Sequence, residues 1–150
     1  MSIALRPCPN DDPAFLQLVS RLDAFLAVTD GEEHGFYDRF NGPDTLDYAL
    51  VLERDGQAVG CGGLRDKGDG DFEIKRMFVA EEARGERLAV VLLRALEDEA
   101  RRRGGRRTVL ETGLRQNAAV RLYAREGYVQ TERYPPYEGM GNSVCFERKL

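Results

Sequence analysis

The sequence predicts one α/β domain with a mixed, mostly antiparallel sheet of about six to seven strands and about four flanking helices. A chain of 150 residues with 42% hydrophobic residues can bury one core and is too short for two ordinary domains. In its first half, strand-length segments are joined by the turn pair Asp55-Gly56 and by an acidic loop, which favour antiparallel hairpins. In its second half they alternate with amphipathic helical segments, which favours a parallel crossover. We therefore expect residues 1–150 to form a single domain.

The N-terminal part predicts a short strand, a helix and an irregular segment. Residues 2–6 are expected to form the strand. Asn10-Asp11-Asp12-Pro13 then offers capping side chains and a first-turn proline, and apolar residues recur at helical spacing as far as Leu26. The segment 29–44 is rich in Gly, acidic and aromatic residues and is expected to be helical in part.

Two hairpins are predicted next. Segments 48–53 and 57–64 flank Asp55-Gly56, a pair suited to the positive φ angles of a tight hairpin turn. The acidic loop 66–71 leads into a strand over 72–79. This loop lacks the ligand positions of a calcium-binding loop, so we expect a solvated turn there and no metal site.

The last third predicts the parallel crossover. Apolar residues from Leu88 to Ala100 mark one stripe of a helix that ends at Gly104-Gly105, and residues 108–110 form a buried strand parallel to 72–79. Asn117 is expected to cap a further helix that stops near Gly127. Strands 128–131 and 144–148 then close the sheet.

Composition argues against several classes of protein. A net charge of −4 and a pI near 5.2 disfavour nucleic-acid binding, and we interpret the basic run 101–107 as cations at a helix C-terminus. No apolar leader or window of ~18 apolar residues predicts a membrane segment, so a cytoplasmic location is expected. Cys8, Cys61 and Cys145 fit neither a disulfide framework nor a zinc site.

A strand followed by a helix N-terminus predicts a site for an anion. The strand includes residues 73–79, and Arg84 to Ala89 open the next helix. The first N–H groups of a helix have no internal partner and carry the positive end of the helix dipole. A cofactor with a diphosphate group is expected to bind there largely through the main chain.

Three segments together resemble the GNAT superfamily of acyl-CoA-dependent N-acyltransferases over essentially the whole chain. They are Phe72 to Val79, Arg84 to Ala89, and Gln116 to Tyr128 with its Asn, its Leu-Tyr pair and its Gly-aromatic ending. The chain departs from the family pattern at Arg87, where the family has Gly. We expect an ordinary right-handed φ for Arg87 as part of the first helical turn.

The resemblance implies a mixed GNAT-like sheet and acetyl-CoA as the acyl donor. The diphosphate would lie on the loop of Arg84, Gly85, Glu86, Arg87, Leu88 and Ala89, and the pantetheine arm beside Met77, Phe78 and Val79. A strand edge suits such an arm because its N–H and C=O groups are unpaired. The resemblance also assigns Asn117 to contact with CoA.

Two residues are the implied catalytic groups. Tyr123 matches the family tyrosine whose hydroxyl meets the CoA sulfur, and Glu73 matches the glutamate that some members use as general base. A phenol donates a hydrogen bond to a thiolate more readily than it loses its proton. The structural alternatives are a core tyrosine and a solvent-facing strand glutamate in an ion pair.

The acceptor implied by the resemblance is a primary amine of a small molecule or a peptide. Tyr37, Glu111, Tyr134 and Tyr137 are the residues expected to line its pocket, with loop packing as the alternative for the tyrosines. A CoA-sensing or scaffold domain without chemistry is the alternative function, and thioester hydrolysis by Cys145 with His34 is a third. The strand 144–148 could also pair between the subunits of a homodimer.

Overall fold

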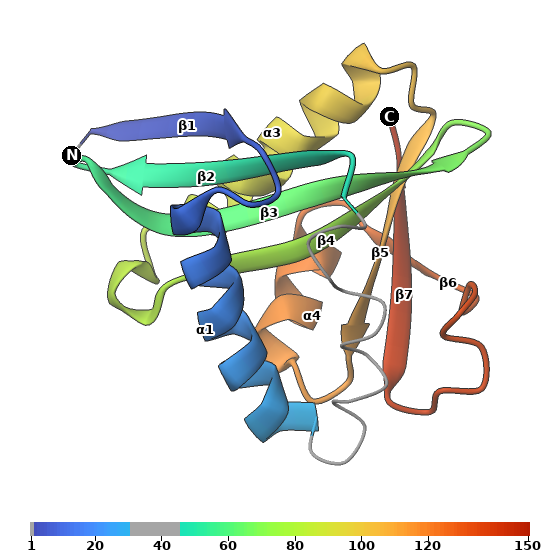
Figure 1. Cartoon of the computed structure of the whole chain (residues 1–150). Helices are drawn as coiled ribbons and strands as arrows, with labels where there is room; N and C mark the ends of the chain where they lie inside the picture. Colours follow the sequence, from blue (N-terminus) through green and yellow to red (C-terminus); the bar gives the residue numbers. More distant parts are fainter. Residues whose placement is uncertain (1, 31–45) are drawn as a thin grey trace.

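Seven strands form one sheet in the order β1-β2-β3-β4-β5-β7-β6 in the computed structural model, which describes residues 2–30 and 46–150 (Figure 1). The strands are β1 (Ile3–Cys8), β2 (Tyr48–Arg54), β3 (Gln57–Gly68), β4 (Asp71–Val79), β5 (Arg107–Gly113), β6 (Val129–Thr131) and β7 (Ser143–Lys149). The helices are α1 (Pro13–Asp30), α3 (Leu88–Arg102) and α4 (Asn117–Arg125), with a 3₁₀ turn, η3 (Glu81–Ala83), before α3.

The predicted fold class is confirmed. Every neighbouring pair of strands is antiparallel except β4 and β5, which are parallel. Helices α1 and α3 cover opposite faces of β3 and β4 (Figure 1). The described residues hold three α-helices, where the sequence predicted about four.

Helix α1 begins as its capping residues predict. The Asp12 carboxylate accepts hydrogen bonds from the backbone N–H groups of Ala14 and Phe15, each at 3.1 Å. Phe15, Leu18, Val19 and Leu22 are buried on one side of the helix. Their burial against the sheet stabilises a helix whose opposite side meets water.

Both hairpin turns use an Asp-Gly pair. Asp55 and Gly56 have φ angles of 52° and 81°, and Asp69 and Gly70 have 57° and 83°. The second loop is shorter than predicted, because β3 continues to Gly68 and β4 starts at Asp71. Acidic residues expected in a solvated loop thus belong partly to strand ends.

The crossover from β4 through α3 to β5 is confirmed. Helix α3 buries one stripe that includes Leu92, Leu93 and Leu96, and Gly104 follows the helix with a left-handed φ of 84°. Strand β5 returns parallel to β4 with Asp71 opposite Arg107.

One expectation for the C-terminal third is wrong. Gln116, not Asn117, is the N-cap of α4, and no side chain makes a capping hydrogen bond there, because Asn117 already lies in the first helical turn. Strand β7 lies between β5 and β6. Its backbone at Cys145 to Glu147 is paired on both sides and is not open to strand pairing with a second subunit.

Candidate functional site

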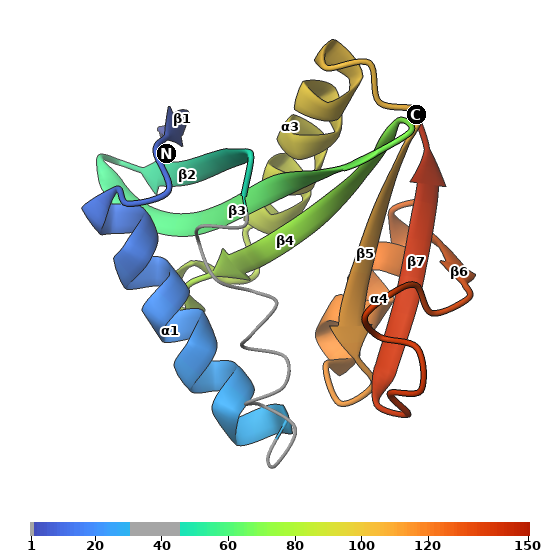
Figure 2. The ribbon, with the colours of Figure 1, turned by 45° about the vertical axis from the view of Figure 1, so that its right-hand side comes forward.

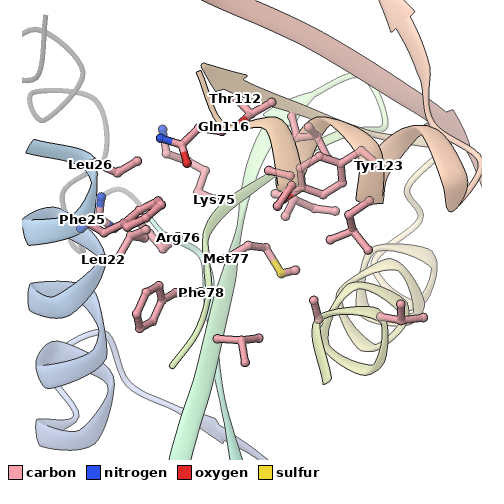
Figure 3. Close-up of a pocket in the computed structure, with 18 of the residues that line it drawn as sticks. Leu22, Phe25, Leu26, Lys75, Arg76, Met77, Phe78, Thr112, Gln116 and Tyr123 are labelled. Atoms are coloured by element: carbon pink, nitrogen blue, oxygen red, sulfur yellow. The ribbon is translucent and has the colours of Figure 1, made fainter. Parts of the chain in front are cut away.

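A cavity opens where β4 and β5 separate. The two strands pair only from Asp71 to Glu73 and from Arg107 to Val109, and then diverge (Figure 2). The cavity has a volume of about 710 Å³ and is lined by residues of α1, β4, β5, α4 and the loop before α3 (Figure 3). Past Glu73 the β4 edge that faces the cavity has no β5 partner, so its backbone is available to a ligand.

A β-bulge in β4 shapes the wall of this cavity. Cys61 lies opposite Phe78 and Gly63 opposite Lys75, so one residue of β3 faces two of β4. Arg76 takes the left-handed φ of 60° that the bulge requires. Its guanidinium bonds Asp23 of α1 at 2.6 Å, whereas Met77 lies close to Leu96 of α3. Arg76 and Met77, the two residues at the bulge, both line the cavity.

The N-terminus of α3 forms one end of the cavity. Gly85, Arg87, Leu88 and Ala89 line it, and no side chain of the described residues caps the helix. The first-turn N–H groups are therefore available as donors. Gly85 has a φ of 83° and open space where a Cβ would lie. These features fit a diphosphate group.

Arg87 corrects one sequence-based expectation. It is the N-cap of α3, with φ 63° and ψ 23°, rather than a right-handed residue of the first turn. The family glycine is explained by this left-handed backbone, which an arginine adopts at a cost of about 1 kcal/mol.

Arg84 and Glu86, in the same loop, differ in whether their side chains line the cavity. Arg84 lines the cavity, donates to the Val79 carbonyl at 3.2 Å and lies over the rings of Phe25 and Phe78. Glu86 does not line the cavity, because its carboxylate pairs with Arg54. Glu86 is thus the one predicted loop residue that does not line the cavity.

Tyr123 lies on α4 at the cavity wall. Its ring packs edge-on against Tyr128, with centroids 5.8 Å apart, and against Phe146 of β7. The side chain is 7% exposed, and burial, with the charge of Glu111 as a further cause, raises the pKa of its phenol. The hydroxyl therefore stays protonated across the physiological range and remains a hydrogen-bond donor.

Glu73 is buried, so the alternative of a solvent-facing strand glutamate is wrong. The residue is 3% exposed and its carboxylate accepts a 2.8 Å hydrogen bond from the Tyr134 hydroxyl. The Lys75 ammonium lies 3.8 Å from its other oxygen. Burial lowers the pKa of Lys75 and Glu73 opposes that effect, whereas burial and Glu73 both raise the pKa of Tyr134.

The candidate acceptor residues come together in part. Glu111 and Tyr137 line the cavity, and Tyr134 reaches it through Glu73, with its ring centroid 5.5 Å from that of Tyr137. Tyr37 lies outside the described residues.

Gln116 lines the cavity and was not predicted to do so. Asn117, the predicted contact, is exposed and does not line it. The Nε2 atom of Gln116 is buried without a hydrogen-bond partner in the structure. The sequence predicted a cavity contact at Asn117, one residue after Gln116. Which of the two side chains faces the cavity depends on the residue at which α4 begins.

The cysteine hypothesis finds no support in the geometry. Cys145 is buried on β7 beside Tyr137, and burial raises the pKa of its thiol, which disfavours the nucleophilic thiolate. His34 lies outside the described residues. Within ranges 2–30 and 46–150, no cluster of metal-binding side chains occurs, and no helix is long and apolar enough to cross a membrane.

Comparison with known proteins identifies the family. Residues 15–128 match the model of the Acetyltransferase (GNAT) family. The chain belongs to the GNAT family of acetyltransferases. An IAA acetyltransferase of Azospirillum brasilense is 35% identical over 149 residues, which are 97% of this chain and 95% of that protein.

Solved GNAT structures share the fold. A crystal structure described as that of an acyl-CoA N-acyltransferase from Klebsiella pneumoniae has a TM-score of 0.84 and 34% identity, with 99% of this chain and 97% of that chain covered. A GNAT acetyltransferase from Elizabethkingia anophelis with acetyl-CoA bound has a TM-score of 0.74 at 17% identity, covering 99% and 98%. This GNAT protein is an acetyl-CoA-dependent N-acetyltransferase.

Proposed function

We propose that this GNAT enzyme acetylates a primary amine of a small molecule or a peptide by direct attack in the cavity between β4 and β5. The observation that carries the proposal is that Tyr123 and Glu73 line the same cavity, which also reaches the uncapped N-terminus of α3. The Cys145 thiol, the nucleophile considered for a covalent route, is kept protonated by burial. The amine itself is therefore the attacking group.

The residues for holding acetyl-CoA follow the course of the cavity. The N–H groups of Leu88 and Ala89 and the open turn at Gly85 suit the diphosphate, and Arg84 and Arg87 add positive charge. The edge of β4 at Met77 to Val79, which has no β5 partner, suits the amide groups of the pantetheine arm, although the Val79 carbonyl already accepts a hydrogen bond from Arg84. When bound, acetyl-CoA supplies an electrophilic thioester carbonyl and a thiol leaving group.

Tyr123 is assigned to the leaving group. Tyr123 lines the cavity, and burial keeps its hydroxyl protonated. It can therefore donate a hydrogen bond to sulfur as negative charge develops there. A donor of this kind acts mainly in the transition state, so its loss lowers turnover more than cofactor affinity.

Glu73 is assigned to the amine. An amine must lose a proton to attack, and a carboxylate in the cavity wall attracts the ammonium form and accepts its proton through a water molecule. The hydrogen bond from Tyr134 fixes the position of this carboxylate. Glu111 lies in the same cavity and adds to the negative potential that favours a cationic acceptor.

A thiol-release assay with a panel of amines tests the function. We expect release of CoA thiol from acetyl-CoA to depend on an added primary amine, and to fall about tenfold or more in Tyr123→Phe while the Kd for CoA is kept. Tight binding of acetyl-CoA with no release for any amine would favour the sensor alternative. Unchanged turnover in Tyr123→Phe would remove Tyr123 from the mechanism.

Hydrolysis is separated from acetylation by the same assay. Thiol release that is independent of amine and is abolished in Cys145→Ala would support the thioesterase alternative. Because Cys145 is buried between Tyr137 and neighbouring strands, we expect Cys145→Ala to retain amine-dependent turnover.

A further inference from the structure

The carbonyl group of Val79, at the end of β4, points away from β3. The N–H group of the next residue, Ala80, donates to the Val59 carbonyl of β3 at 2.8 Å. The Val79 carbonyl and the Ala80 N–H group belong to one trans peptide plane, so they point in opposite directions. The carbonyl therefore belongs to the edge of β4 that has no β5 partner. A pantetheine arm along this edge would pair with it.

Arg84 covers this carbonyl. Its Nε atom donates a hydrogen bond to the Val79 carbonyl oxygen at 3.2 Å. The central carbon of its guanidinium lies 5.6 Å from the ring centroid of Phe25 and 5.9 Å from that of Phe78. Figure 3 shows these two rings on the α1 side of the cavity. The guanidinium and a pantetheine amide would therefore compete for the same acceptor in the cavity wall.

The charge of Arg84 has no carboxylate partner among the residues that the structure describes. Arg21, which lies over the same Phe78 ring, is paired with Glu82 at 2.8 Å. Arg84 is exposed and directly precedes Gly85, in the loop that leads to the N-terminus of α3. Rotation about its own side-chain bonds can therefore carry the guanidinium from the end of β4 to an anion at that N-terminus.

The two parts of CoA act on Arg84 in opposite ways. A pantetheine amide that pairs with the Val79 carbonyl displaces the guanidinium, which then loses a hydrogen bond and its contacts with two aromatic rings. A diphosphate at the N-terminus of α3 offers the same guanidinium charge-assisted hydrogen bonds, which are stronger. Only a donor that carries both groups compensates the displacement.

We propose that Arg84 makes the cavity selective for acyl donors that carry a diphosphate, because its guanidinium leaves the Val79 carbonyl to the pantetheine arm only when a diphosphate binds it instead. The inference rests on the proposed function, since it concerns the acyl donor that the same cavity holds. Thioesters of pantetheine without a diphosphate are disfavoured twice: they lack the contacts of the helix N-terminus, and they must displace Arg84 without compensation. Arg84 is thus a residue for donor specificity, not for the chemical step.

Binding of pantetheine and of CoA to Arg84→Met tests the inference. Methionine keeps an apolar side chain beside Phe25 and Phe78 and removes the guanidinium. By isothermal titration calorimetry, we expect pantetheine to bind the variant about threefold more tightly than the wild type, because the Val79 carbonyl is uncovered. We expect CoA to bind the variant about threefold or more weakly, because a cation for the diphosphate is lost. The ratio of the two Kd values should therefore fall about tenfold.

Arg87→Met is the matched control. Arg87 is also an exposed arginine at the α3 end of the cavity, but Arg84 is the residue that donates to the Val79 carbonyl. The same substitution at Arg87 is expected to weaken CoA binding and to leave the Kd for pantetheine unchanged. Tighter pantetheine binding in Arg84→Met alone would therefore be specific to the contact with Val79. Both side chains are exposed, so neither substitution removes core packing.

The outcomes separate this inference from the proposed function, because the binding measurements need neither an amine nor turnover. If CoA binds the wild type but pantetheine binds Arg84→Met with unchanged or lower affinity, the role of Arg84 is overturned and the acetyltransferase proposal stands. If Arg87→Met tightens pantetheine binding equally, the effect comes from loss of charge alone, and the inference is again overturned. If CoA does not bind the wild type, the cofactor site fails and both proposals fall with it.

Discussion

The φ angle of Arg87, in the loop before α3, affects the stability of the protein. The residue has φ 63°, and its side chain is exposed at the rim of the cavity. The left-handed conformation places strain on any residue with a Cβ, and glycine relieves it. Arginine occupies this position in spite of that strain, and its charge lies at the cavity end that suits a phosphate.

Replacing Arg87 by glycine tests this explanation. We expect Arg87→Gly to raise the free energy of unfolding by about 0.5–1 kcal/mol, because relief of strain exceeds the added entropy of the unfolded chain. Urea denaturation measures the change. Arg87→Ala removes the same charge and keeps the strain, so equal stabilisation by both substitutions would contradict the backbone explanation.

The same residue shows what the sequence could not predict at this scale. Its place in the motif was evident, but whether it begins the helix or precedes it depends on how η3 delivers the chain to α3. Whether Gln116 or Asn117 faces the cavity likewise depends on the residue at which the helix begins. A shift of one residue turns a side chain by about 100° around a helix.

Among the elements, the junction of β4, β5 and β7 fixes the point from which the parallel strands diverge. Arg107 forms hydrogen bonds of 2.8 and 3.0 Å with Asp71 of β4 and pairs with Glu147 of β7. Asp71 and Arg107 are also opposite each other in the strand register. These partly exposed contacts hold together the closed end of the cavity.

The stability of this junction should depend on pH. The hydrogen bond from Arg107 lowers the pKa of Asp71 below its ordinary value of 3.8, so the carboxylate stabilises the fold above that pH and the effect is lost as the pH falls through the lowered pKa. We expect Arg107→Met to reduce the free energy of unfolding by about 1 kcal/mol at pH 7.

The difference in free energy of unfolding between wild type and Arg107→Met should shrink as the pH falls from about 4 through the lowered pKa of Asp71, below which the aspartate is protonated in both the folded and the unfolded state. Thermal unfolding from pH 3 to pH 7 follows this trend. A difference that stays constant across the whole range would mean that the arginine acts through packing rather than through its charge.

Local patterns predicted most elements, and tertiary contacts decided the rest. The Asp55-Gly56 turn and the cap of α1 are encoded within a few residues, and they form as expected. The bulge at Arg76 has no local signal, because it arises from the mismatch between β3 and β4. The position of β7 inside the sheet likewise depends on β6 pairing to its outer edge.

At the scale of the whole molecule, a buried carboxylate connects the two sides of the cavity. Glu97 of α3 is 0% exposed and accepts hydrogen bonds from Arg94, from Arg148 of β7 and from the Tyr128 hydroxyl. Arg94 also donates to the carbonyl and carboxylate of Glu126, at the end of the helix that carries Tyr123. The cluster thereby joins the α3 end of the molecule to the half that contains Tyr123.

Removing this carboxylate should destabilise the whole fold. Glu97→Leu leaves two arginines and a buried hydroxyl without their shared acceptor, and we expect a loss of about 3 kcal/mol or more in the free energy of unfolding. Asp98→Leu, which removes the adjacent exposed carboxylate paired with Arg101, is expected to cost less than about 0.5 kcal/mol. Urea denaturation of both variants gives the comparison, and equal losses would contradict a special role for Glu97.

The central claim is that the divergence of β4 and β5, together with the N-terminus of α3, binds acetyl-CoA. Isothermal titration calorimetry with CoA and with pantetheine alone tests it most directly. We expect a saturable heat signal for CoA, and binding of pantetheine weaker by about a hundredfold or more because it lacks the diphosphate that the helix N-terminus holds. No heat with CoA, or equal affinity for the two molecules, would contradict the claim.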